Sequence, residues 1–261
     1  MSILKPAPLF VRSTVIVALA VLASGCTSTP TAKPGSCESV PYAVHDPAEP
    51  VNRGIFAFNR TVDDYALAPV ARGYRKLPDM FQAGVHNFVA NFGEPKVFIN
   101  DLLQGNGQRS VTTLGRFVIN TTVGIVGLID VSGKMGIARH ESDFGQTFGV
   151  WNIAPGPIVE LPLLGTANLR DATGKVVSFV VDPFGDNSDT VQTLGTIKTV
   201  GGVVDGRAQA LPLTDQLQAR PDYYVALRDA IAQRRADFVA DGKLGAVQDE
   251  PQCPERGGAD E

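Results

Sequence analysis

The residue with the clearest potential for covalent chemistry is Cys26, which follows three small residues, Ala-Ser-Gly. The residues ahead of it include two basic and no acidic side chains, and an apolar run over 15–22. This run is too short to span a bilayer, which takes about 20 apolar residues, but it fits the apolar part of a signal peptide, about 7–15 residues long. We therefore expect residues 1–25 to be a signal peptide that is cleaved before Cys26, whose thiol carries a diacylglyceryl group. The alternative is an ordinary signal peptide whose cleavage site lies beside a cysteine.

Acylation of this cysteine would hold the protein on a membrane. Each buried methylene contributes about 0.8 kcal/mol, and three acyl chains exceed the two signals that stable anchoring takes. Thr27 stands where an Asp is the usual inner-membrane retention signal of enteric bacteria, so we expect the outer membrane, with the body on the periplasmic side. Residues 26–45 contain the cysteine and a small, polar, Pro-containing stretch that we interpret as a flexible tether. The acidic, Gly/Pro-rich residues 243–261 are predicted to be a disordered tail.

The other side chains with chemical potential do not form a catalytic or metal-binding pattern. Cys37 and Cys253 lie near opposite ends of the chain, and a disulfide between them stays open, because it is plausible in an exported protein but nothing fixes their distance. His86 lies beside an aromatic helix stripe and is interpreted as structural. The sequence contains no Gly-x-Ser-x-Gly and no His-Glu-x-x-His motif. We therefore predict no enzyme activity, no catalytic residue, no metal and no cofactor.

Composition and charge limit the partners of the chain. Its 261 residues carry a formal net charge of −4, without the basic footprint of a nucleic-acid-binding protein. A polybasic patch that would attract anionic lipid heads is also missing. A hydrophobic content of 44% is enough for a substantial core. Any affinity for a membrane must therefore come from acyl chains and apolar surface.

Helical periodicity dominates residues 46–242, which we interpret as the folded domain. After Pro50, apolar residues recur at steps of three and four, which predicts a helix over 50–65 closed by Pro69. Two separate helices are predicted over 78–92 and 96–104, because Gly93 and Pro95 interrupt the pattern. Residues 132–170 are rich in Gly and Pro and are predicted to be loops with short helical turns. Further helices are predicted from Ser110, from Asn168 or Asp171, over 190–211 and over 221–242.

One apolar stretch, residues 117–131, allows two interpretations. It is too short and too polar for a membrane-spanning helix, with Asn120 and Asp130 inside it and Gly124 and Gly127 breaking it. It can be a buried core segment or a lipid-facing hairpin. The residues alone favour the core segment.

Five segments, in one order and covering most of the chain after Cys26, carry a resemblance to a known family. The segments are DPAEPVNRGIFAFNRTVDDY (46–65), NTTVGIVGLIDVSG (120–133), FGQTFGVW (144–151), GPIVELPLLGTANLRD (156–171) and RPDYYVALRD (220–229). They resemble the MlaA (VacJ) outer-membrane lipoproteins. The resemblance implies a mostly α fold: a ring-shaped helical body with an amphipathic central channel and Gly/Pro-rich loops, lying in the outer membrane beside trimeric porins. It implies that phospholipids misplaced in the outer leaflet enter the channel and pass to a soluble periplasmic carrier, MlaC-like, which maintains lipid asymmetry.

Specific residues can be assigned within this scheme. We predict that Asn52, Asn59 and Asp63 border the path of the lipid head group, and that Gly124 and Gly127 are the hinges of a mobile hairpin. For each residue taken singly, a polar helix flank or plain core is an equally good interpretation. The alternative for the whole protein is a structural envelope lipoprotein that braces porins without transferring lipid.

Overall fold

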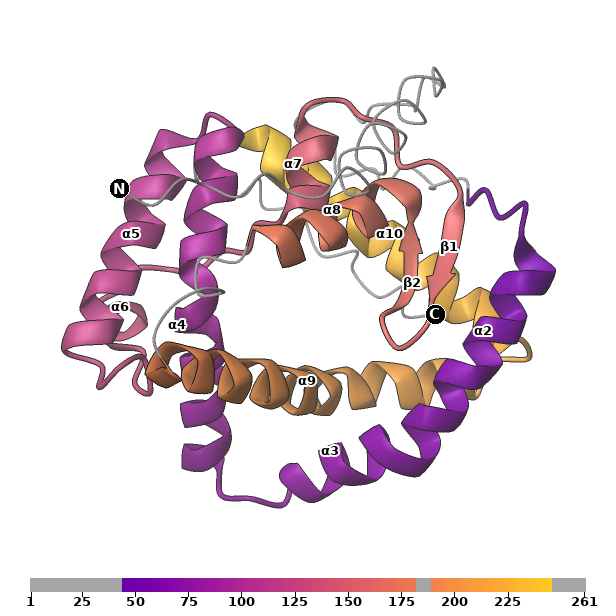
Figure 1. Cartoon of the computed structure of the whole chain (residues 1–261), viewed down its shortest axis with the longest axis horizontal. Helices are drawn as coiled ribbons and strands as arrows, with labels where there is room; N and C mark the ends of the chain where they lie inside the picture. Colours follow the sequence, from indigo (N-terminus) through magenta and orange to yellow (C-terminus); the bar gives the residue numbers. More distant parts are fainter. Residues whose placement is uncertain (1–43, 182–188, 246–261) are drawn as a thin grey trace, which may run out of the picture.

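The computed structural model describes residues 44–181 and 189–245 (Figure 1). The predicted signal peptide, the predicted acylation site Cys26, residues 26–43 of the predicted tether, the candidate disulfide partners Cys37 and Cys253, and residues 246–261 lie outside the described residues. Predictions about them therefore stay predictions. Within the described part the fold is mostly helical, as the sequence predicts.

The first described helix runs further than predicted. Helix α2 (Glu49–Val62) has Pro50 in its first turn, where the missing N–H costs no hydrogen bond. A five-residue π-helical turn, η2 (Asp63–Leu67), connects it directly to α3 (Ala68–Tyr74). Pro69 was expected to end the helix, but it lies in the first turn of α3, just after the π-helical turn, where a residue without an N–H is tolerated.

Helix α4 (Asp79–Leu103) is one continuous helix, so the predicted break at Gly93 and Pro95 is wrong. A proline in a helix interior costs about 3 kcal/mol. Here α4 packs along its length against α5 (Gly107–Thr122) and against α9 (Asp189–Gln218), and this packing offsets the cost. Tertiary contacts therefore override a local signal.

The segment after α4 also corrects two predictions. The N-cap of α5 is Asn106, whose side chain accepts a hydrogen bond from the backbone N–H of Arg109, while Ser110 lies inside the helix. After α5 the chain turns through 123–130 into the short helix α6 (Val131–Lys134), capped by Asp130. The favoured core interpretation is wrong for the turn, because its large apolar side chains are exposed: Val123, Ile125, Val126, Leu128 and Ile129.

The Gly/Pro-rich region contains a β-hairpin that the sequence did not predict. Helix α7 (Phe144–Val150) precedes the antiparallel strands β1 (Ile158–Leu161) and β2 (Gly165–Asn168). Ile158 pairs with Asn168, and Leu161 with Gly165. Helix α8 (Leu169–Val180) follows at once, and Asn168 caps it through a hydrogen bond from the N–H of Asp171, so the prediction of a helix start there is confirmed.

The last two helices connect the parts of the molecule. Helix α9 contacts α3 and α4, and its contact with α3 contains the small apolar cluster Ala68, Ala71, Ala208 and Leu211. Helix α10 (Tyr223–Leu244) contacts α7, α9 and β2 and ends two residues beyond the predicted limit. In Figure 1, α4 and α5 lie side by side at one edge, α2 lies at the opposite edge, and α9 runs between them. Helices α7, α8 and α10 lie with the hairpin along the remaining side.

Candidate functional site

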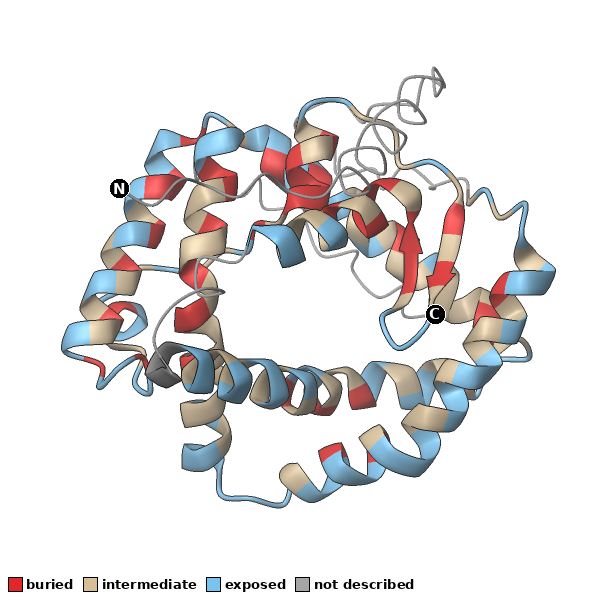
Figure 2. Cartoon of the chain, in the orientation of Figure 1, coloured by how far each residue is buried: buried red, intermediate tan, exposed pale blue. Residues whose placement is uncertain are grey.

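Helix α5 buries its polar side and exposes its apolar side. The buried positions follow steps of three and four, so they form one face of the helix. The helix lies at the edge of the molecule (Figure 2). Its buried residues are Arg109, Ser110, Thr113, Arg116 and Asn120, and its exposed large apolar residues are Val111, Leu114 and Val118.

Helix α2 has the same inverted arrangement. The apolar stripe that predicted the helix includes Val51 and Phe58, which are 64% and 52% exposed. The residue of α2 that is buried is the polar Asn52. Among the described residues of the whole chain, buried polar and charged side chains outnumber buried apolar ones.

An exposed apolar surface of this extent marks contact with a membrane or another protein. Leaving this apolar surface in water would be unfavourable, because each Å² of apolar area removed from water stabilises a protein by about 25 cal/mol. None of the helices in residues 44–181 and 189–245 has the length and apolar character needed to cross a bilayer. The exposed apolar surface therefore calls for a partner, either lipid or another protein.

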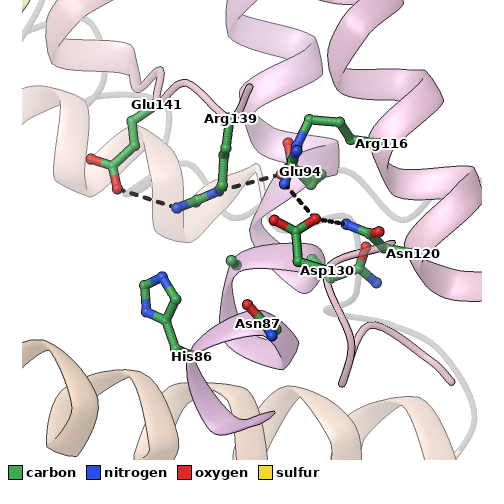
Figure 3. Close-up of a pocket in the computed structure, with 10 residues that line it drawn as sticks. His86, Asn87, Glu94, Arg116, Asn120, Asp130, Arg139 and Glu141 are labelled. Carbon is green, nitrogen blue, oxygen red and sulfur yellow. Dashed lines mark hydrogen bonds and ion pairs between the residues drawn. The ribbon is translucent and has the colours of Figure 1, made fainter. Parts of the chain in front are cut away.

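A cavity of about 360 Å³ lies behind this surface, between α4, α5 and the segment after α6 (Figure 3). Its wall combines carboxylates, guanidinium groups and amides, whereas small-molecule pockets are mostly lined by apolar side chains. The lining residues are His86, Asn87, Ala90, Asn91, Glu94, Arg116, Asn120, Asp130, Arg139 and Glu141.

Glu94 lies at the centre of the charged wall. It is 2% exposed, with the Nε of Arg139 at 3.4 Å and the Nε of Arg116 at 3.7 Å from its Oε1. Burial raises the pKa of Glu94, and the two guanidinium groups oppose this effect without cancelling it. The cations around this carboxylate therefore compensate its buried charge only in part.

Asp130 closes the cavity on the side of the 123–130 turn. Its Oδ1 accepts hydrogen bonds from Arg116, Asn120, Ser132 and the backbone N–H of Gly133, each 2.9 or 3.0 Å long. Burial alone would raise the pKa of Asp130, but these donors outweigh it and lower the pKa to about 2. Asp130 is thus held as a carboxylate that fixes the end of α5 to α6.

This carboxylate predicts a pH dependence of stability. Its pKa is lower in the folded than in the unfolded protein, so its contribution is present above about pH 4 and is lost as the pH falls toward 2. Between about pH 5 and pH 3, we expect the free energy of unfolding to fall less in the variant Asp130→Asn than in the unchanged protein, because the amide binds no proton there. Urea unfolding of the detergent-purified protein at both pH values measures this. Equal losses would contradict the prediction.

The predicted head-group residues Asn52 and Asn59 both bind the β-hairpin. Asn52 donates to Asp46 and to the carbonyl of Ile158, and accepts from the N–H of Glu160. Asn59 donates to the Glu160 carboxylate and to the Leu161 carbonyl, and accepts from the N–H of Leu163. The structure thus gives both side chains a part in docking the hairpin on α2. Their place beside a head-group path stays a prediction.

Asp63, the third predicted head-group residue, binds a different element. Both of its carboxylate oxygens accept from Arg207 of α9, at 2.6 and 2.7 Å. The three predicted residues therefore share one side of α2 and η2, but the hairpin and α9 use their polar atoms.

The predicted hinge glycines lie in a tightly folded turn. A Cβ on Gly124 would meet the Ile129 carbonyl oxygen at 2.2 Å, and a Cβ on Gly127, which has a φ of 87°, would meet Asn91 at 2.5 Å. Backbone hydrogen bonds join Gly127 to Asn120 and Ile129 to Gly124. These contacts explain why both residues are glycine, and a hinge motion stays a prediction.

The sequence did not indicate the charged cavity. Its main charged residues, Glu94, Arg116, Asp130 and Arg139, come from four separate elements. The available signal was the polar stripe of α5, which places Arg116 and Asn120 on one face. Taken alone, this stripe fits a helix with its polar face in water.

Comparisons of this sequence with known proteins give matches to one family. The MlaA lipoprotein family model matches residues 44–237. The intermembrane phospholipid transport system lipoprotein MlaA of Escherichia coli (strain K12) is 32% identical over 239 residues, covering 87% of this chain and 88% of that protein. An uncharacterized protein of Rickettsia conorii is 36% identical over 208 residues, covering 78% of this chain and 82% of the other.

A solved structure described as "Structural basis for maintenance of bacterial outer membrane lipid asymmetry" superposes with a TM-score of 0.64 at 34% identity. The match covers 74% of this chain and 98% of the solved one. The family model, the identities and this likeness agree, and the chain belongs to the MlaA lipoprotein family.

Proposed function

We propose that this chain is an outer-membrane lipoprotein that removes misplaced phospholipids from the outer leaflet and passes them to a soluble periplasmic carrier. The Escherichia coli relative is named for intermembrane phospholipid transport, and the solved structure that this chain resembles concerns outer-membrane lipid asymmetry. The family is associated with the outer membrane. In this proposal the acylated Cys26 anchors the chain, the body is embedded among lipids and the protein acts without catalysis.

The inverted helices α2 and α5 carry the proposal. A body that exposes apolar side chains and buries polar ones suits surroundings of lipid tails and a route for polar head groups. Moving a two-chain lipid through water exposes about 30 methylenes, a barrier on the order of 25 kcal/mol at about 0.8 kcal/mol each. A conduit lowers this barrier only when it offers apolar lining to the tails and polar groups to the head. We propose that the helices form a ring around such a conduit, beside a trimeric porin.

A deletion strain tests the function. Loss of transfer should bring phospholipid to the cell surface, increase sensitivity to detergent and release vesicles. A protein that only braces porins should change porin assembly and leave asymmetry normal. Normal surface phospholipid in the deletion strain would therefore overturn the proposal.

The predicted residue roles need a finer test. Asn59→Ala and Gly124→Pro, each expressed in the deletion strain, should leave surface phospholipid close to the level of the empty strain. Asn59→Ala removes the hydrogen bonds of Asn59 with the hairpin and leaves those of Asn52. Gly124→Pro puts a ring in the 123–130 turn where a Cβ would already meet the Ile129 carbonyl oxygen. Surface phospholipid is measured by labelling of intact cells.

Thr61→Ala is the matched control for Asn59→Ala. It lies on the same helix, and its hydroxyl donates to the helix carbonyl of Ala57 on an exposed face. This variant should restore asymmetry fully. If Asn59→Ala and Gly124→Pro also restored it at normal protein levels, the assignments would be abandoned.

A further inference from the structure

The charge balance of the cavity in Figure 3 favours a positively charged ligand. Three carboxylates line it, those of Glu94, Asp130 and Glu141, against the two guanidinium groups of Arg116 and Arg139. The other cation in the wall, His86, is already paired with Asp205 of α9 at 2.9 Å if it is protonated.

The wall also contains an acceptor that has no donor. Asn91 is 2% exposed, and its Nδ2 donates to Thr121 at 2.9 Å. Its Oδ1 has no hydrogen-bond partner within the described residues. Buried acceptors are rarely left unpaired, because an unpaired group costs about 1–3 kcal/mol. This oxygen therefore points to a ligand that donates hydrogen bonds.

The two guanidinium groups differ in how closely they are paired with acceptors of the protein. Arg116 donates to Asp130 and to the carbonyl of Ile137, and its side chain is almost fully buried. Arg139 is partly exposed, and its contacts with Glu94 and Glu141 are 3.4 and 3.5 Å long. Contacts of this length are weak, so Arg139 can turn toward an anion beside the cation site.

The cavity adjoins apolar surface. The exposed turn 123–129 packs on the cavity wall, where Asn87 donates to the carbonyl of Leu128 and Gly127 lies directly against Asn91. The large apolar side chains of this turn are exposed. A ligand with a zwitterionic head and apolar tails would thus find a site for each part within a few residues.

We propose that this cavity is a head-group site for phospholipids that carry a primary amine, with the ammonium between Glu94, Glu141 and Asn91 and the phosphate at Arg139. A primary ammonium has three N–H donors, which suit carboxylates and the unpaired amide oxygen. It would take the place of the Arg139 guanidinium, which lies between Glu94 and Glu141 and would turn to the phosphate. A quaternary ammonium has no donor and a glycerol head has no positive charge. This inference rests on the proposed phospholipid transport and adds a preference for one class of head group.

The experiment measures which lipids the full-length protein extracts. Purified acylated protein is incubated with vesicles that contain phosphatidylethanolamine and phosphatidylglycerol in equal amounts, and the bound lipids are quantified by mass spectrometry. A second vesicle replaces phosphatidylethanolamine by phosphatidylcholine. We expect phosphatidylethanolamine to be enriched about tenfold, as one additional charge-assisted hydrogen bond gives, and phosphatidylcholine not to be enriched.

Glu141→Gln is the decisive variant, because Glu141 is exposed and the change keeps its size. It should abolish most of the enrichment of phosphatidylethanolamine over phosphatidylglycerol. Asp237→Asn is the matched control, since Asp237 is an exposed carboxylate on α10 outside the lining of this cavity. It should keep the enrichment. Glu94→Gln should act like Glu141→Gln, and the exposed variant decides if the buried one does not fold.

The outcomes separate this inference from the proposed function. Binding of both lipids in the vesicle ratio, or full enrichment by Glu141→Gln, would overturn the head-group site and leave phospholipid transport intact. Binding of no phospholipid would contradict both. A third arm adds soluble phosphoethanolamine: if it binds while the lipid is not enriched, the site serves a soluble compound and the lipid assignment is wrong.

Discussion

Arg235→Met is expected to lower the free energy of unfolding by about 1.5–3 kcal/mol, the usual contribution of hydrogen bonds to charged groups. Arg235 of α10 donates through Nη1 and Nη2 to both oxygens of Asp143, and through Nε to Asp171. Asp171 is 5% exposed and keeps Arg170 at 2.9 Å, whereas the side chain of Asp143 is 46% exposed. The variant would remove the cation that these two carboxylates share, and would weaken the contact of α10 with α7 and α8. Urea unfolding in detergent, followed by circular dichroism, measures the loss.

Arg72→Met is the matched control for this change. Arg72 pairs with Asp215 at 3.2 Å, but both side chains are about half exposed. Exposed pairs contribute about 0–1 kcal/mol, because water screens them. Equal losses for the two variants would show that the α10 network does not stabilise the fold more than a surface pair.

Gly174→Ala is expected to destabilise the protein by about 1–3 kcal/mol, the usual cost of adding a methyl group to a packed interior. Its Cβ would lie 2.4 Å from the backbone nitrogen and 2.9 Å from the Cα of Gly145. Both obstacles are backbone atoms, which cannot rotate away. Helices α7 and α8 would have to separate. The shift in the urea midpoint measures the effect.

Gly115→Ala gives the opposite expectation. Gly115 lies inside α5, and a Cβ there would meet no atom within 4 Å. Replacing a free helical glycine by alanine stabilises by about 0.5–1 kcal/mol, because alanine has less conformational freedom to lose. If both alanine variants were destabilised alike, the close contact at Gly174 would not be the cause.

Local signals predicted the starts of α8 and α10, which both begin with a polar cap. Asn168 accepts from the N–H of Asp171, and Asp222 accepts from the N–H of Val225, so the starts of α8 and α10 depend on a few neighbouring residues. The continuity of α4 through Pro95 depends instead on packing against distant helices. The β-hairpin was missed because its strands have four residues each, too few to show an alternating pattern.

The candidate site was harder to predict for a physical reason. The sequence of α5 shows one polar and one apolar face, but periodicity is the same whichever face points inward. Which face of the helix points inward depends on the solvent that surrounds the helix. The cavity adds Arg139 and Glu141 from an irregular segment, which no periodicity connects to Glu94 on α4. The resemblance to a lipoprotein family supplied the missing information about the surroundings.

The hydrogen bonds of Asn52 and Asn59 have a consequence for how such chains can change in length. The two asparagines are seven positions apart, about two turns of helix, and both reach the same short hairpin. One residue inserted between them would rotate the second amide by about 100° and aim it away from its partners. The number of residues between the two asparagines is therefore fixed by the hairpin that both of them contact. Natural insertions and deletions among homologues should therefore fall outside the stretch between Asn52 and Asn59, since any change there also alters its length by about 1.5 Å per residue.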